Sequence, residues 1–205
     1  VGSGAGDNTS SSHYQVCIGY NSGGTFGSHN IMVGPNTGTV NTGSENTFIG
    51  SSCAYLNTSG DENVIVGRFA GYRQTVANNN TIIGTESGFY NTVSNVTFIG
   101  YKSGYSNTTG EYNTMVGYSS GYSNLTGTKN TMLGYYSGYS NTIGERNTFI
   151  GFDSGKNNTS GDYNVYVGSG AGDNTSSSHY QVCIGYNSGG TFGSHNIMVG
   201  PNTGT

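Results

Sequence analysis

The chain has 205 residues, only 8% of them charged, and its formal net charge is -4. It contains 37 Gly, 17 Tyr, 2 Pro and no Trp. The few charges form no basic stripe, and no apolar run reaches about 18 residues, so neither nucleic-acid binding nor membrane insertion is expected. This composition also excludes an ordinary helical domain, and it leaves a disordered chain or a strictly repeating β structure.

A recurring sequence motif favours the repeating β structure over a disordered chain. Three apolar or β-branched residues precede a Gly, and this Gly recurs in steps that are mostly 17 residues, with two of 16 and two of 15. We call each step a rung and number its positions from this Gly, so that the -1 rank is the column of residues just before it. In chain order, the predicted strands are 16–18, 31–33, 47–49, 64–66, 81–83, 97–99, 114–116, 131–133, 148–150, 165–167, 182–184 and 197–199.

A rung of about 17 residues is too short to hold a hairpin with its own core, but it can be one coil of a parallel solenoid. The sequence therefore predicts an all-β fold, a single continuous parallel β-solenoid or β-roll over residues 1–205. Residues 167–205 are identical to residues 1–39. We therefore interpret 1–166 as one tandem unit of ten coils, about 48 Å long at the strand spacing, and 167–205 as the beginning of the next. Since the chain starts at Val1 without Met, we expect a processed protein or a piece of a longer one.

The two sides of each predicted strand are both apolar. The -1 rank is aliphatic and the -3 rank β-branched in every strand, so both are expected to face the core, because alternate residues of a strand share a face. The -2 rank between them would then point outward, and such an apolar column is expected to lie at a contact between chains. The alternative is the reversed assignment, in which Thr faces water and one apolar rank still lies outside. This predicted inter-chain interface consists of Cys17, Met32, Phe48, Ile65, Ile82, Phe98, Met115, Met132, Phe149, Tyr166, Cys183 and Met198.

Asparagine and tyrosine also recur at fixed positions. The -4 rank is interpreted as a structural ladder, because Asn can hydrogen-bond to its own kind in the next rung. Tyrosines at +1 and +5 are candidates for stacking on sugar rings or for contact with another filament, but a structural role in covering the turns is the preferred interpretation. The predicted ladder consists of Asn30, Asn46, Asn63, Asn80, Asn113, Asn130, Asn147, Asn164 and Asn196. The tyrosines are Tyr101, Tyr105, Tyr118, Tyr122, Tyr135 and Tyr139.

Residues that could carry catalysis are sparse. Carboxylates lie singly in predicted turns, apart from the adjacent pair Asp61 and Glu62, so the general acid-base pair of an enzyme is not expected. His13 and His29 are 16 residues apart and could meet on neighbouring rungs, but no further ligand accompanies them. We expect no enzyme activity, no cofactor and no metal site.

The stretches "TFIGYKSG" (97–104) and "TMVGYSSG" (114–121) resemble the head repeats of trimeric autotransporter adhesins. Similar Asn-Thr-x-Ile-Gly repeats occur in phage tail-fibre-like proteins. The first resemblance implies left-handed parallel β-rolls, three of which pack about a common axis. The coils of that family are typically shorter than 17 residues, and its coiled-coil stalk and membrane anchor are not seen here.

The predicted function is a structural extracellular fibre or adhesin shaft that mediates surface attachment or matrix formation. Its expected partners are copies of itself, as a homotrimer or an end-to-end filament, and a host surface or polysaccharide. The expected location is extracellular or at the cell surface. One alternative is a phage tail-fibre shaft. Another is an ice-binding β-solenoid, but the expected position of the Thr rank on the core face argues against it.

Overall fold

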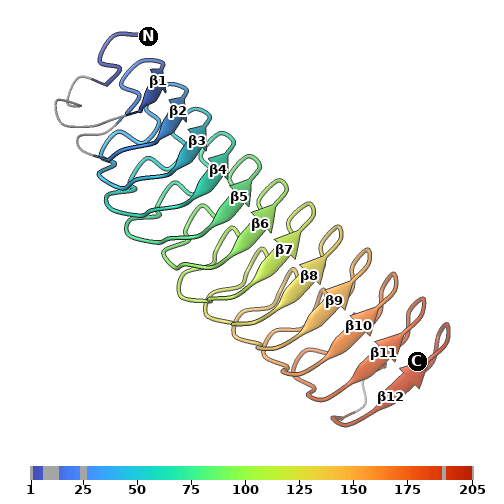
Figure 1. Cartoon of the computed structure of the whole chain (residues 1–205). Helices are drawn as coiled ribbons and strands as arrows, with labels where there is room; N and C mark the ends of the chain where they lie inside the picture. Colours follow the sequence, from blue (N-terminus) through green and yellow to red (C-terminus); the bar gives the residue numbers. More distant parts are fainter. Residues whose placement is uncertain (1, 7–13, 24–26, 191–192, 205) are drawn as a thin grey trace.

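The computed structural model describes residues 2–6, 14–23, 27–190 and 193–204, and the predictions on Val1 and His13 lie outside these ranges. Over the described residues the chain is a parallel β-solenoid with about 17 residues per coil (Figure 1). Twelve parallel strands form one sheet in sequence order. The predicted fold class is confirmed.

Each strand is three residues long and ends just before the recurring Gly. The strands are β1 (Val16–Ile18), β2 (Ile31–Val33), β3 (Thr47–Ile49), β4 (Val64–Val66), β5 (Thr81–Ile83), β6 (Thr97–Ile99), β7 (Thr114–Val116), β8 (Thr131–Leu133), β9 (Thr148–Ile150), β10 (Val165–Val167), β11 (Val182–Ile184) and β12 (Ile197–Val199).

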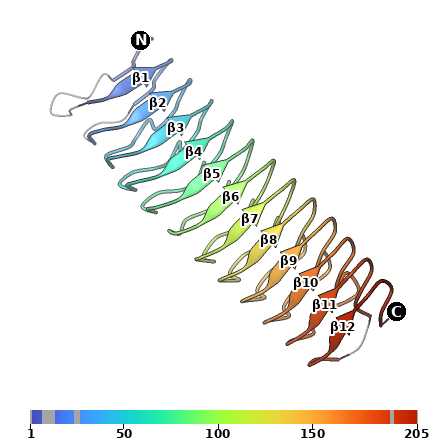
Figure 2. The ribbon, with the colours of Figure 1, turned by 45° about the vertical axis from the view of Figure 1, so that its right-hand side comes forward.

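The register is the same between all neighbouring strands. Residues of one rank are direct partners, as Phe98 and Met115 are in β6 and β7. Each rank is therefore a straight column along the solenoid axis, and the strands lie behind one another in a single row (Figure 2).

The interior of the solenoid holds the -2 rank, which corrects the predicted face. From Met32 to Cys183 every member of this rank is 0% exposed within a single chain. A side chain enclosed by its own coil cannot contact another chain, so the predicted inter-chain interface is wrong. The corrected residues are Cys17, Met32, Phe48, Ile65, Ile82, Phe98, Met115, Met132, Phe149, Tyr166, Cys183 and Met198, of which Cys17 and Met198, in the end strands, are partly buried.

The turn after the strand explains why the -2 side chain fits inside. A small residue at +3 is followed at +4 by Gly, or in one rung by Ala54, and this pair lies opposite the -2 rank. A Cβ atom on Gly104 would lie 2.7 Å from the ring of Phe98, so a side chain there would force neighbouring atoms to shift. The hydroxyl of Ser103 donates a hydrogen bond of 2.7 Å to the backbone oxygen of Met115 in the next rung. The small pair thus makes room for one large side chain per coil and ties adjacent coils together.

Two columns of amide side chains complete the interior. In the predicted -4 ladder, the Asn130 side-chain oxygen accepts a 2.9 Å hydrogen bond from the backbone N–H of Asn147. The Asn130 amide donates to the oxygen of Gly144 at 2.8 Å. The same pattern joins Asn147 to Asn164 and Asn46 to Asn63. These bonds satisfy polar groups that would be costly to bury unpaired.

A second amide column at +7 was not predicted. Asn141 donates through its side-chain amide to the side-chain oxygen of Asn124 at 2.8 Å, and Asn124 donates to Asn107 at 2.7 Å. Gln74 replaces Asn in one rung, and the oxygen of Asn57 below it has no hydrogen-bond partner. The signal was visible in the sequence, since Asn stands seven residues after the Gly in most central rungs.

Candidate interaction surfaces

No pocket is present in the described part of the chain. The same residues bring together no group of three or more His, Cys, Asp or Glu side chains that could hold a metal ion, and they include no helix that could cross a membrane. The candidate sites are therefore the long faces of the solenoid.

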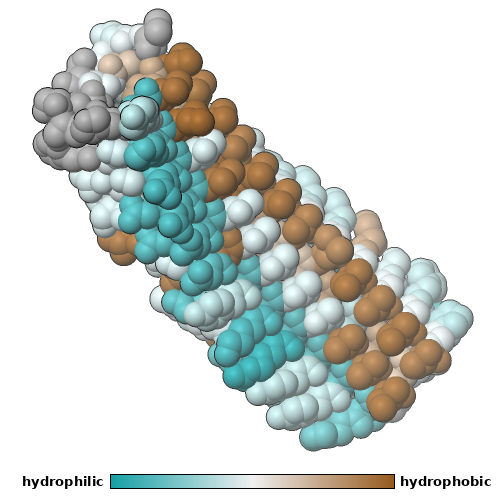
Figure 3. Space-filling model, in the orientation of Figure 1, coloured by the Kyte–Doolittle hydropathy of each residue, from teal (hydrophilic) through white to brown (hydrophobic). Residues whose placement is uncertain are grey.

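The outer strand face consists of the -1 and -3 ranks, which the sequence had placed in the core. These side chains are exposed or half-buried along the whole sheet. Hydrophobic residues form stripes along the length of the molecule (Figure 3). The -1 rank is Ile18, Val33, Ile49, Val66, Ile83, Ile99, Val116, Leu133, Ile150, Val167, Ile184 and Val199. The -3 rank is Val16, Ile31, Thr47, Val64, Thr81, Thr97, Thr114, Thr131, Thr148, Val165, Val182 and Ile197.

Threonine occupies the -3 rank in five successive strands, from Thr81 in β5 to Thr148 in β9. Neighbouring members such as Thr114 and Thr131 are direct register partners. An aliphatic -1 column runs parallel to these residues. The centre of the outer strand face is therefore a regular array of hydroxyl and methyl groups.

The predicted tyrosines form two stacked columns on the turns. At +5, the rings of Tyr105 and Tyr122 lie 5.1 Å apart with an interplanar angle of 2°, and Tyr139 continues the stack at 5.1 Å. At +1, the distance from Tyr101 to Tyr118 is 5.0 Å. Tyr135 and Phe152 extend this second column, as Tyr55, Tyr72 and Phe89 extend the first.

The stacking limits what these rings can bind. A sugar or another planar ligand would need an open ring face, but the faces inside each column are covered by the neighbouring rings. What remains accessible is the outer edge of each ring with its hydroxyl. The +1 tyrosines are about 40% exposed, whereas Tyr105, Tyr122 and Tyr139 are half-buried. The columns stabilise the stacking of rungs, and they offer no platform for face-on binding to their inner members.

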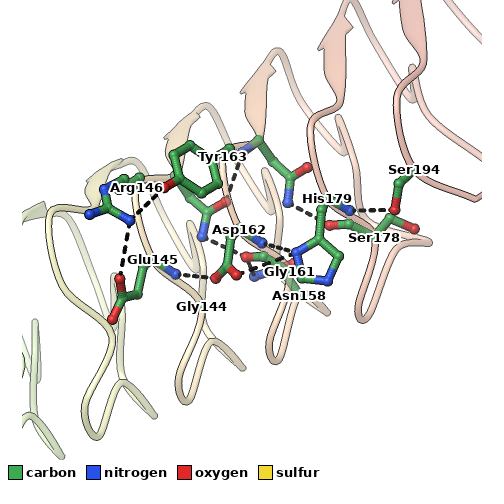
Figure 4. A network of polar contacts seen from close by, with 12 residues as sticks. Gly144, Glu145, Arg146, Asn158, Gly161, Asp162, Tyr163, Ser178, His179 and Ser194 are labelled. Carbon is green, nitrogen blue, oxygen red and sulfur yellow. Dashed lines mark hydrogen bonds and ion pairs between the residues drawn. The ribbon is translucent and has the colours of Figure 1, made fainter.

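A third set of rung-to-rung hydrogen bonds joins the turns that precede β9, β10, β11 and β12 (Figure 4). The backbone N–H of Glu145 donates to Asp162 at 2.7 Å, that of Asp162 donates to Nδ1 of His179 at 3.0 Å, and that of His179 donates to Ser194 at 3.0 Å. Beside this column, the Arg146 guanidinium donates to the hydroxyl of Tyr163 at 2.6 Å. These hydrogen bonds tie neighbouring rungs together at this turn.

Two of the described histidines, His29 and His195, stack on aromatic rings, whereas His179 lies beside Asp162. His29 stacks on Tyr14 at 5.1 Å, and His195 stacks on Tyr180 at 4.9 Å. The thiols of Cys53 and Cys183 are free and buried. Burial raises the pKa of Cys183 to about 11 and that of Cys53 further still, so both thiols are protonated near neutral pH.

No protein-family model, no curated protein sequence and no solved structure matches the chain.

Proposed function

We propose that the chain is a segment of a stiff structural rod that serves as the shaft of an extracellular fibre or adhesin. The observation that carries this proposal is the repetition of the same bonds at each step. The strand pairing, the serine bond to the next rung and the amide columns recur along the solenoid. In such a repeat protein each coil contacts only its neighbours, so length can grow without a new core.

The resemblance to trimeric autotransporter heads and to phage tail-fibre-like repeats supports the same reading. It also suggests lateral association, for which the outer strand face replaces the -2 rank as the contact surface. Aliphatic side chains such as Leu133 and Ile49 lie on this face and are more than a third exposed. Covering them with the same face of other copies would remove an apolar stripe from water.

Electron microscopy of tandem arrays tests the rod. Chains carrying one, two and four copies of the 166-residue unit should appear as particles of constant width. Their length should increase by about 48 Å for each unit, from ten coils at the strand spacing. Particles that grow wider, or that fold into separate globules joined by linkers, would contradict the proposal.

A second candidate function is ice binding, which the corrected outer strand face favours. The objection to it was a Thr rank turned toward the core, and this rank lies outside. Thr114 and Thr131 are both exposed on the row of parallel strands.

Thermal hysteresis and ice-crystal shape measured on the purified chain test this candidate. If ice is bound, replacing Thr114 and Thr131 by Lys should abolish hysteresis. The same substitution at Thr126, which is exposed away from this face, should leave hysteresis unchanged. Absence of hysteresis in the unmodified chain at millimolar concentration would exclude the candidate.

A further inference from the structure

The +1 aromatic column lacks a single ring in the rung that begins after β10 (Figure 1). Phe152 stacks on Tyr135 at 5.2 Å, Ser169 takes the +1 position of the next rung, and Tyr186 takes that of the rung after it. Successive rungs are about 4.8 Å apart, so the positions of Phe152 and Tyr186 are separated by about 9.6 Å along the axis. We call the space beside Ser169, between these two rings, the ring slot.

The backbone passes the ring slot without a break. The N–H of Gly170 donates to the oxygen of Phe152 at 2.8 Å, and that of Asn187 donates to the oxygen of Ser169 at 2.9 Å. The φ angle of Ser169 is not positive, so this backbone would also accept a large side chain. The ring is therefore missing because of the residue type alone. The slot is open to solvent and is not an enclosed pocket.

Both rings that flank the ring slot are exposed, Phe152 to 53% and Tyr186 to 58%. Within the described residues, Tyr135 is the one ring that stacks on Phe152, and no ring stacks on Tyr186. The opposite end of the column differs, because Nζ of Lys102 lies 5.3 Å from the ring centre of Tyr101. The Phe152 end is therefore the one at which a ring face is available to a ligand.

The polar groups beside the ring slot are neutral. Ser169 is exposed, and the side-chain oxygen of Asn187 occupies the space in which a side chain at Gly170 would begin. Lys156 is the only lysine or arginine in residues 151–190, and it is paired with Asp153 at 3.0 Å. A nucleotide or another anion would therefore find no free positive charge here.

We propose that the ring slot binds one pyranose ring of a neutral polysaccharide between Phe152 and Tyr186. A pyranose at the midpoint would lie about 4.8 Å from each ring, within the range of stacked aromatic pairs. Its two C–H faces are apolar and its hydroxyl groups lie on the rim. The faces would contact the rings, and the rim would meet Ser169 and Asn187. This inference rests on the proposed function and names the class of ligand that the shaft contacts.

Titration with soluble oligosaccharides tests the ring slot. Cellohexaose and chitohexaose are added to the purified chain, calorimetry measures binding, and saturation-transfer NMR identifies the sugar protons near the protein. We expect at least one of the two to bind, with the strongest transfer to its ring C–H protons. Phe152→Ala and Tyr186→Ala should each weaken binding by about tenfold, since each removes one stacking contact.

Ser169→Tyr is the most direct variant, because it adds the missing ring and leaves both flanking rings in place. It should abolish binding without lowering the denaturation midpoint of the chain. Tyr112→Ala is the matched control: Tyr112 is 56% exposed, and it stacks on no ring in the described part of the chain. Its removal should leave binding unchanged. If Ser169→Tyr does not fold, the two alanine variants decide the outcome.

The inference is overturned if neither oligosaccharide binds, or if binding is unchanged in Ser169→Tyr or in both alanine variants. Binding of choline in place of a sugar would show a cation site between the rings and would also overturn it. The length of the tandem arrays measures the rod separately. Arrays that lengthen while no sugar binds leave the proposed function in place, whereas arrays that do not lengthen contradict it whatever the sugar result.

Discussion

The interior of each rung is divided between one large side chain and the small pair that faces it. Met115 lies in this interior, while Thr114 beside it points to solvent. Of two adjacent residues in one strand, one side chain is therefore enclosed and the other is exposed to solvent.

Truncating these two residues should have very different effects. Met115→Ala removes enclosed methylene groups and leaves a cavity, so the free energy of unfolding should fall by about 2–5 kcal/mol. Thr114→Ala should change it by no more than about 1 kcal/mol, which is the span of β-propensity. Chemical denaturation of both variants checks the difference. Equal losses would contradict the assignment of the -2 rank to the core.

The recurring Gly of the rung is required by backbone shape and by the distance between coils. Gly151 has φ of +135°, and a Cβ there would lie 2.5 Å from the oxygen of Gly168. Gly151→Ala should lower the free energy of unfolding by more than about 1 kcal/mol, because neither the angle nor the space suits a side chain.

Thr126→Ala is the control, since the Thr126 side chain is exposed on a turn. Its free energy of unfolding should stay close to that of the unmodified chain. A Gly151→Ala variant as stable as this control would show that the coils can move apart to accept a methyl group.

At the scale of the elements, the columns of side-chain hydrogen bonds hold consecutive coils in register. Backbone hydrogen bonds of the strands and turns join consecutive coils, and the buried amides add side-chain bonds to them. Asn124 occupies the middle of the +7 column, between Asn107 and Asn141.

Asn124→Ala should therefore destabilise the chain by about 1–3 kcal/mol, because it leaves buried amide groups without partners. Asn157→Ala is the control: that side chain is exposed, and its hydrogen bonds to Asp173 compete with water. Thermal or chemical unfolding measures both changes. If the two variants lose equal stability, the buried amide hydrogen bonds do not stabilise the contact between rungs.

The buried Tyr166 and the half-buried Tyr105 and Tyr139 make the stability of the fold depend on pH in the alkaline range. Burial raises the pKa of Tyr166, and it also raises that of Tyr105 and Tyr139. An unfolded tyrosine titrates near pH 10, so above this value the unfolded chain loses protons that the folded chain retains. Their contribution to stability is complete below about pH 10 and falls as the pH rises further.

Tyr166→Phe should make this alkaline decline less steep, because phenylalanine cannot ionise. The denaturation midpoint measured between about pH 9 and 12 gives the slope for both chains. A slope that does not differ would mean that Tyr166 ionises freely in the folded state.

At the scale of the whole molecule, the sequence repeat was enough to predict the architecture. It was not enough to predict which side of each strand faces the interior of the solenoid. The spacing of the Gly column predicted the strands and their parallel order. The strands are apolar on both sides, so alternation alone could not decide whether Met115 or Val116 faces inward. The deciding feature was Gly104 opposite Phe98, where the small turn residues make room for the -2 rank. The +7 amide column was missed because its burial depends on how the turns close.

Distances between spin labels on the outer strand face test the rod most directly. Labels at Ile49, Leu133 and Ile184 lie on β3, β8 and β11 and point to solvent. At about 4.8 Å per rung, the spacing of the labelled positions should be about 24 Å from 49 to 133 and about 38 Å from 49 to 184, with narrow distributions. Distances that stop growing with the number of rungs, or broad distributions, would contradict a continuous stiff solenoid.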